Sequence, residues 1–116
     1  MIIRKLEILK ESNIIDQEIY TYVLSVMNSL NDQGIATDEE TPAETFLTHL
    51  AMAAARQKNE DPPIERLDSI IREDLMCDPN FSRAQAIWNA LENFSPVSFG
   101  EEEIDYFYLH ICNMIR

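Results

Sequence analysis

The sequence has 116 residues, 46% of them hydrophobic, which suits one globular domain with a buried core and leaves little room for a second. Nine Lys and Arg against 21 Asp and Glu give a net charge of −12. Direct binding to nucleic acid needs a cationic surface, so we expect no DNA- or RNA-binding function. The same charge disfavours anionic membrane surfaces and suits a basic protein partner.

Targeting, membrane and disulfide signals are also weak. Charged residues at Arg4, Lys5 and Glu7 interrupt the apolar start that a signal peptide requires. No segment approaches the roughly 18 consecutive apolar residues of a membrane-spanning helix. The two cysteines, Cys77 and Cys112, form neither a CxxC metal pair nor a disulfide framework. We therefore expect a cytoplasmic protein.

In chain order, residues 1–12 predict an N-terminal extension or a short helix, and residues 13–116 predict one helical domain. A first long helix runs from Ile15 to near Gly34, because its apolar residues recur every three to four positions. They are Ile19, Tyr22, Val23, Val26 and Leu30. The next helix starts at the run 41–44, where an N-cap Thr precedes a Pro at the first helical position and a capping-box Glu.

Three more helices follow. The pattern places one after Asp61-Pro62-Pro63, with the apolar residues Ile64, Leu67, Ile70 and Ile71. Asp78-Pro79 introduces another, with Phe81, Ala84, Ile87, Trp88 and Leu91. A capping box over residues 98–101 opens the last, with Ile104, Phe107, Tyr108, Ile111 and Ile115. Amphipathic helices joined by short connections predict an all-α fold, a compact five-helix bundle.

The two histidines, His49 and His110, both lie within predicted helices at the margin of an apolar face. Arg56 follows His49 by seven residues and Glu103 precedes His110 by seven. Seven residues make nearly two helical turns, so each charged residue lies on the same line of its helix as the histidine. Each histidine is therefore expected to be half shielded and still accessible.

Several kinds of site are not supported. A histidine at such a margin is commonly a half-buried packing residue with one hydrogen bond. A metal site lacks His-x₃-His spacing, and Cys112 lies on a different face from His110. The apolar surroundings of Cys112 are expected to raise its thiol pKa and leave it inert. With two glycines and no GxSxG turn, no phosphate loop or nucleophile elbow is present. We expect no enzyme active site, metal or cofactor.

Three segments resemble motifs of one family. The run 46–56 (FLTHLAMAAAR) resembles the first histidine motif, roughly His-x₃-Ala-x₂-Arg, of the phosphotransferase-system regulation domain (PRD). The run 103–111 (EIDYFYLHI) resembles its second motif, Glu-x₆-His, and the run 79–87 (PNFSRAQAI) is similar to its proline–aromatic helix start. The resemblance spans about residues 13–115.

That resemblance implies a five-helix bundle, often dimeric, of the kind found in bacterial antiterminators and transcription activators. It implies that His49 and His110 accept phosphoryl groups from phosphocarrier proteins of the sugar phosphotransferase system, with Arg56 and Glu103 as supporting residues. The domain would then relay carbon-source status to a downstream partner protein or through dimerisation. We expect a homodimer, since Leu109 falls off the main apolar face of its helix and indicates a second buried surface.

Two departures from the family pattern matter. Family members usually carry this domain behind an RNA- or DNA-binding module, which these residues lack, so we expect action alone or through another protein. Asp105 takes a place often held by a small residue and adds negative charge before His110, which favours His49 as the acceptor. The alternative function is a helical protein-interaction module of the same fold that no longer accepts phosphate.

Overall fold

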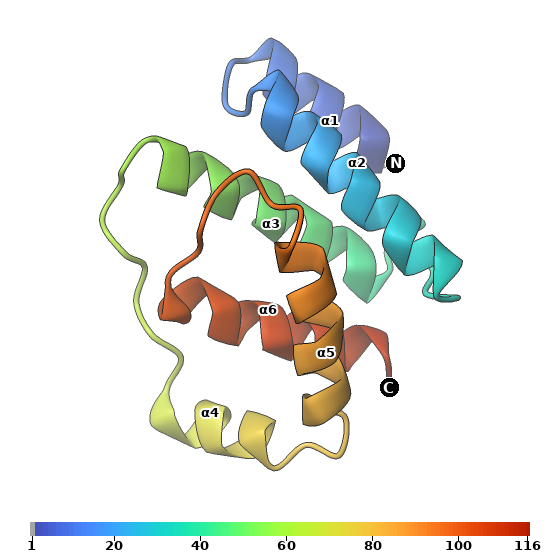
Figure 1. The fold of residues 1–116 in the computed structure, drawn as a ribbon, viewed down its shortest axis with the longest axis vertical. Coiled ribbons are helices and arrows are strands. Elements are labelled where there is room, and N and C mark those ends of the chain that lie inside the picture. Colours follow the sequence, from blue (N-terminus) through green and yellow to red (C-terminus); the bar gives the residue numbers. More distant parts are fainter. Residues whose placement is uncertain (1) are drawn as a thin grey trace.

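A computed structural model describes residues 2–116, and within that range the secondary structure is entirely helical (Figure 1). Its six helices are α1 (Ile2–Glu11), α2 (Gln17–Asp32), α3 (Pro42–Lys58), α4 (Ser69–Met76), α5 (Phe81–Glu92) and α6 (Glu101–Met114). The all-α prediction is confirmed, whereas the predicted number of five helices is wrong. The additional helix is α1, whose Ile2 and Leu6 are one turn apart and both buried in the core.

The first two helices form a hairpin that packs on α3 (Figure 1). Asn13 in the connecting turn has a φ of +62°, a left-handed conformation that asparagine tolerates better than most residues. Asp16 is the N-cap of α2, and its carboxylate accepts a hydrogen bond of 2.9 Å from the backbone N–H of Ile19. This local chemistry fixes where the chain reverses and α2 begins.

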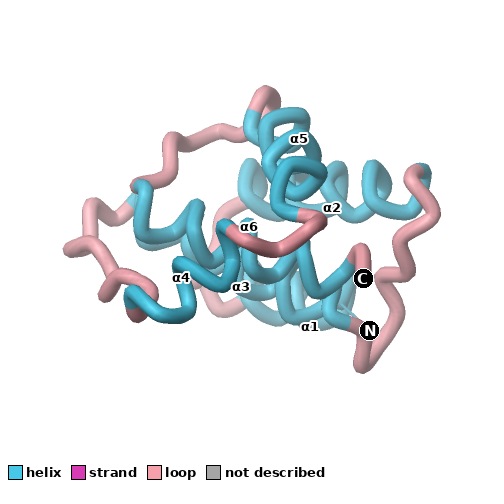
Figure 2. Tube along the Cα trace, turned by 90° about the horizontal axis from the view of Figure 1, so that it is seen from below, coloured by secondary structure: helices cyan, strands magenta, loops and turns pink. Residues whose placement is uncertain are grey.

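Helix α3 is the central element of the bundle, with α1, α2 and α6 packed around it (Figures 1 and 2). Small side chains make this possible, because they let neighbouring helices approach closely on several sides. The buried alanines of α3 are Ala43, Ala51, Ala53, Ala54 and Ala55. A helix that is apolar around most of its circumference is expected to lie in the interior.

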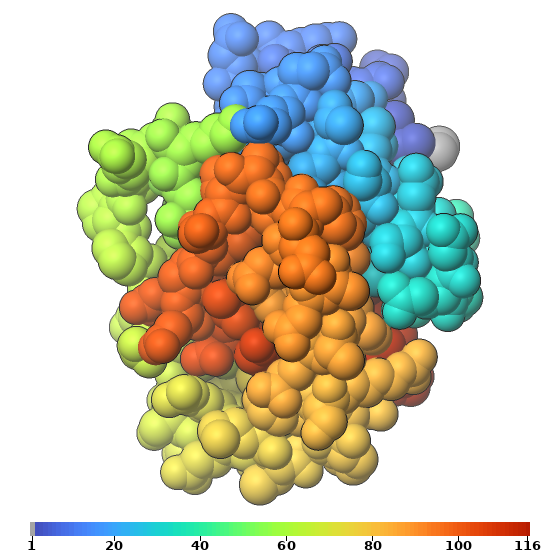
Figure 3. Space-filling model, viewed as in Figure 1, coloured from blue at the N-terminus to red at the C-terminus, as the bar shows by residue number. Residues whose placement is uncertain are grey.

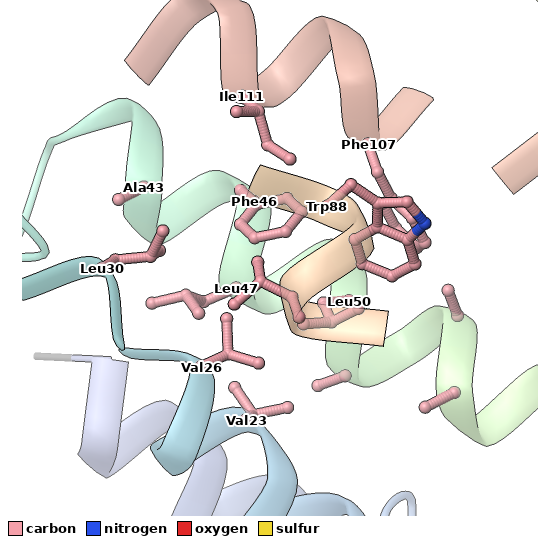
Figure 4. Close-up of a cluster of buried hydrophobic side chains, with 14 of the residues drawn as sticks. Val23, Val26, Leu30, Ala43, Phe46, Leu47, Leu50, Trp88, Phe107 and Ile111 are labelled. Carbon is pink, nitrogen blue, oxygen red and sulfur yellow. The ribbon is translucent and has the colours of Figure 1, made fainter. Parts of the chain in front are cut away.

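The main core lies between α2, α3, α5 and α6 (Figure 4). Phe46 on α3 meets Phe107 on α6 edge to face, with ring centroids 5.8 Å apart. Trp88 on α5 also contacts Phe107, with ring centroids 4.6 Å apart. Val23 and Val26 reach the same cluster from α2. Phe107 thus contacts rings from both α3 and α5, which fixes the position of α6 between them.

Helix α4 begins later than the sequence pattern predicts. Its N-cap is Asp68, whose carboxylate accepts a 2.9 Å hydrogen bond from Ile70 N–H, so Ile64 and Leu67 belong to the preceding connection. Leu67 is buried there without being helical. Ile70 and Ile71, two of the apolar residues placed on this helix, are 68% and 45% exposed. These two apolar residues therefore do not form the buried face of α4, which buries Leu75 instead.

Two capping predictions also need correction. Thr41 is the N-cap of α3 and Pro42 its first residue, as predicted, but the Thr41 hydroxyl donates to the Asp38 carbonyl at 2.6 Å and makes no capping-box bond. Gly100, not Ser98, is the N-cap of α6. Phe99 precedes it as a buried loop residue beside Trp88, with ring centroids 5.5 Å apart, and this packing delays the start of the helix.

The surface leaves the beginning of α6 accessible. In the space-filling view, α5 covers part of α6, while the first residues of α6 remain visible beside it (Figure 3). Leu109, predicted to serve a second buried surface, is half-buried and packs against the core.

Across residues 2–116, none of the helices has the length and apolar character needed to cross a membrane.

Candidate functional site

The four residues predicted to form the site meet at the contact between α3 and α6, which lie side by side (Figures 1 and 2). His49 and Arg56 come from α3, and Glu103 and His110 come from α6. The two helices run in opposite directions (Figure 1). Seven residues forward along α3 therefore match seven residues back along α6, a shift of about 10 Å in each helix. This antiparallel register places His49 opposite His110, and Arg56 opposite Glu103.

Hydrogen bonds join the four side chains in a continuous order. Arg56 donates from Nε and Nη2 to Glu103 Oε1, at 3.2 and 2.7 Å. The other carboxylate oxygen, Oε2, lies 2.9 Å from His49 Nε2. His49 Nδ1 in turn lies 3.1 Å from His110 Nε2. The order is Arg56–Glu103–His49–His110, and it crosses between the two helices at every step. We call this chain of side chains the histidine network.

Aromatic rings hold the two imidazoles in place. The His49 ring lies 5.3 Å from Phe107 and 5.8 Å from Tyr106, measured between centroids, and contacts both edge-on. His110 is 6.3 Å from Phe46, the residue one turn before His49 on α3. The two imidazoles are nearly perpendicular, with an interplanar angle of 85°. Packing against the core thus limits the rotation of each ring and preserves its hydrogen bonds.

Glu103 carries a buried negative charge, since its side chain is only 4% exposed. Burial by itself raises the pKa of a carboxyl group, but hydrogen bonds from His49 and Arg56 and the guanidinium charge outweigh it. The net effect holds the pKa of Glu103 below its usual value, so the group is a carboxylate at neutral pH. A carboxylate can only accept hydrogen bonds. His49 Nε2 therefore carries a proton and donates a hydrogen bond to Glu103.

His110 is uncharged in the fold. Burial, followed by the nearby His49, lowers the pKa of His110 from 6.5 to about 4. At neutral pH its ring is therefore an imidazole with one nitrogen lone pair available for bonding or for nucleophilic attack.

The network lies at the rim of the bundle. The side chains of His49 and Arg56 are 19% and 31% exposed, and His110 is also partly exposed. A small cleft of about 120 Å³ opens beside Arg56 and Glu103, bounded by Pro63, Gly100 and other residues of the two connections. Both histidines are therefore partly buried and partly exposed at the contact between α3 and α6.

Ion pairs that were not predicted from the sequence lie around the start of α6. Arg72 on α4 lies 3.4 Å from Asp105, and Arg66 lies 3.2 Å from Glu101 and 3.7 Å from Glu102. The negative charge that Asp105 adds before His110 is therefore partly compensated by Arg72. These pairs hold α4 and the connection before it against α6. Opposite charges at 66 and 72 were visible in the sequence, but only the fold brings them to α6.

The remaining chemical groups do not join this site. Cys112 is buried, and burial raises the pKa of its thiol, while Cys77 is exposed at the end of α4. In the part of the chain that the structure describes, no group of three or more His, Cys, Asp and Glu side chains is arranged to hold a metal ion.

Comparisons with family models, with curated proteins and with solved structures give no match for this chain.

Proposed function

We propose that this domain accepts a phosphoryl group on its histidine pair from a phosphocarrier protein of the sugar phosphotransferase system. It acts in the cytoplasm and relays carbon-source status to a partner protein or through its own dimerisation. One observation carries the proposal: residues from two separate PRD-like motifs join in a single hydrogen-bonded chain, with donor–acceptor distances from 2.7 to 3.2 Å.

The chemistry required of an acceptor is modest. The carrier presents a phosphoryl group that is already activated, so the acceptor supplies a neutral imidazole nitrogen, fixed in orientation and open to a visiting protein. His110 is partly exposed and kept neutral by its lowered pKa, and His49 is also partly exposed, which supports an acceptor role for the pair. Glu103 and the surrounding aromatic rings supply the orientation.

The location of the two histidines between α3 and α6 suits the transmission of a signal. Phosphorylation adds between one and two negative charges at neutral pH. Here the added charge enters a network that already contains the buried carboxylate of Glu103, in a chain with a net charge of −12. Arg56, which is held by Glu103 in the unmodified protein, is the cation within this network that can respond. Redistribution of these contacts acts directly on the packing of α3 against α6.

Phosphorylation in a reconstituted system tests the proposal. The full chain is incubated with phosphoenolpyruvate, the first enzyme of the system and the phosphocarrier, and acid-labile protein-bound phosphate is measured. We expect label on the wild type and on Asn113→Ala, an exposed control position one turn beyond His110. We expect none on the double variant His49→Ala/His110→Ala. Absence of label on the wild type, or label that survives in the double variant, overturns the proposal.

A second candidate function is a protein-interaction module that does not accept phosphate. The exposed side chains of Ile70 and Ile71 on α4 favour it, because neighbouring exposed apolar residues are typical of protein contacts. This function predicts a blank labelling experiment and a partner whose binding is weakened by Ile70→Ser but unchanged by His49→Ala.

A further inference from the structure

We infer that His110 receives the phosphoryl group on Nδ1, and that His49 positions its ring and takes up its Nε2 proton during transfer. This inference rests on the proposed function and assigns distinct roles to the two histidines. It departs from the sequence-based preference for His49 as acceptor.

The protons of the network are assigned in order along its hydrogen bonds, starting from Glu103. Glu103 is a carboxylate, so His49 Nε2 must donate to it. We assign the other nitrogen of this ring, Nδ1, as the acceptor in the bond to His110, so that the ring holds a single proton on Nε2. The hydrogen bond of 3.1 Å to His110 is then donated by His110 Nε2. Burial lowers the pKa of His110 to about 4, so this ring is neutral, and with its proton on Nε2 its lone pair lies on Nδ1.

The two histidines differ in which nitrogen is free. Both nitrogens of His49 are engaged, one with Glu103 and one with His110. Among residues 2–116, nothing hydrogen-bonds to His110 Nδ1. That atom is not among the buried polar atoms lacking a partner, which are Glu44 Oε2 and Trp88 Nε1, so it keeps contact with solvent. His110 Nδ1 is thus the one imidazole nitrogen of the pair that is not fully buried and has no hydrogen-bond partner among residues 2–116.

The transfer step balances with these groups alone. The Nδ1 lone pair of His110 attacks the phosphorus of a protonated phosphohistidine on the carrier, and a new P–N bond forms. The P–N bond to the carrier breaks, and its electron pair stays on the carrier imidazole, which leaves as a neutral ring. The Nε2 proton of His110 passes across the hydrogen bond to His49 Nδ1. The products are a neutral-ring phosphohistidine at 110 and an imidazolium at 49.

The Glu103 carboxylate is already in place to stabilise the positive charge that appears on His49 during transfer. The imidazolium donates through Nε2 to the Glu103 carboxylate, already 2.9 Å away, and through Nδ1 to the modified His110 ring. Arg56 continues to hold the opposite oxygen of Glu103. The objection raised by Asp105 is weakened, because Arg72 lies 3.4 Å from it. Glu103 and His49 are positioning residues in this scheme, and His110 is the residue that reacts.

The phosphorylated nitrogen can be identified directly. The full chain is labelled with ¹⁵N-histidine, phosphorylated by the phosphohistidine form of the carrier, and studied by long-range ¹H–¹⁵N correlation with ³¹P detection. We expect phosphorus coupled to Nδ1 of His110. Phosphorus on His49, or on Nε2 of His110, overturns the inference while leaving the proposed function intact. If the chain takes up no phosphate at all, the proposed function itself fails.

Replacement of His49 tests its separate role. His49→Asn retains a hydrogen-bond acceptor near the position of Nδ1 but cannot take up a proton. We expect the label to remain on His110, with transfer slowed by about 10²-fold, the size typical of a lost general base. We also expect the pH profile of the rate to lose one ionisation, which a purely structural defect does not produce. An unchanged rate and profile overturn the role of His49, and label retained in His110→Asn overturns that of His110.

Discussion

His49 and His110, 61 positions apart in the sequence, share a hydrogen bond of 3.1 Å between Nδ1 and Nε2. One lone pair and one proton are needed for that bond, so the charge or modification of either ring changes what the other can do. Glu103 sets the other end of the His49 ring, because its carboxylate accepts a hydrogen bond from Nε2, the nitrogen that faces away from His110. The consequences are measurable in stability and in transfer rate.

Acidification is expected to destabilise the fold through His110. Its folded pKa of about 4 lies below the ordinary value of 6.5, so between these values the unfolded chain binds a proton that the folded chain does not. Stability therefore falls as pH decreases from 6.5, and the loss is complete below about 4. Partial exposure limits the effect to about 2–3 kcal/mol. Urea unfolding followed by Trp88 fluorescence measures it, with His110→Gln as the variant that lacks this titration. Parallel pH dependence in the two proteins contradicts the prediction.

Removal of the Arg56 guanidinium is expected to lower the free energy of unfolding, because the buried carboxylate of Glu103 then lacks its cation. Arg56→Met should lower the free energy of unfolding by about 2–3 kcal/mol at pH 7, because the carboxylate loses its cation. The folded pKa of Glu103 lies below the ordinary 4.5, so the stability from its charge is present above 4.5 and is lost as pH falls below it. The deficit of the variant should therefore shrink below pH 4. Urea titrations at pH 7 and below pH 4 measure both effects.

Arg66→Met is the matched control for that measurement. It also removes a guanidinium from an ion pair with α6, but Arg66 and Glu101 are both well exposed. Exposed pairs contribute about 0–1 kcal/mol, so the control should lose little stability at either pH. Equal losses in the two variants would show that Glu103 gains no particular stability from Arg56.

Phosphoryl transfer is expected to depend on Glu103 more than on its neighbours. Glu103→Gln removes the charge that sets the proton position on His49 and stabilises the imidazolium, so transfer should slow by roughly 10²-fold. Glu101→Gln, two residues earlier on α6 and exposed, should stay close to the wild-type rate. Quench-flow measurement of label uptake from the phosphorylated carrier distinguishes them. Similar slowing in both variants would indicate a general effect of charge on carrier binding.

The two faces of α4 are expected to respond differently to truncation. Leu75→Ala should cost about 2–4 kcal/mol, because Leu75 is the buried residue of this helix. Ile70→Ser should change stability by less than about 0.5 kcal/mol, since the side chain is already exposed. Thermal unfolding by circular dichroism compares the two. A large loss in Ile70→Ser would mean that its apolar side chain is covered in the protein as it exists in solution.

Local sequence determined the helical class and most helix positions, because these depend on neighbouring residues. Pro42 after Thr41 fixed the start of α3, and the apolar spacing from Ile15 to Leu30 predicted α2. The number of helices and the start of α4 could not be obtained in this way. Whether Leu6 joins the core, and whether Ile70 does not, depends on surfaces supplied by distant segments.

The candidate site also depends partly on local sequence and partly on tertiary packing. The sequence by itself placed His49 and Arg56 on one helix, and Glu103 and His110 on another, each pair seven residues apart. Along one helix that spacing is about 10 Å, too far for direct contact within a pair. Only the antiparallel packing of α3 on α6 decided the partners, so that Glu103 binds the histidine and the arginine of the other helix. Which nitrogen is free to react is therefore a property of the tertiary structure, since each proton is set by a partner from the opposite helix.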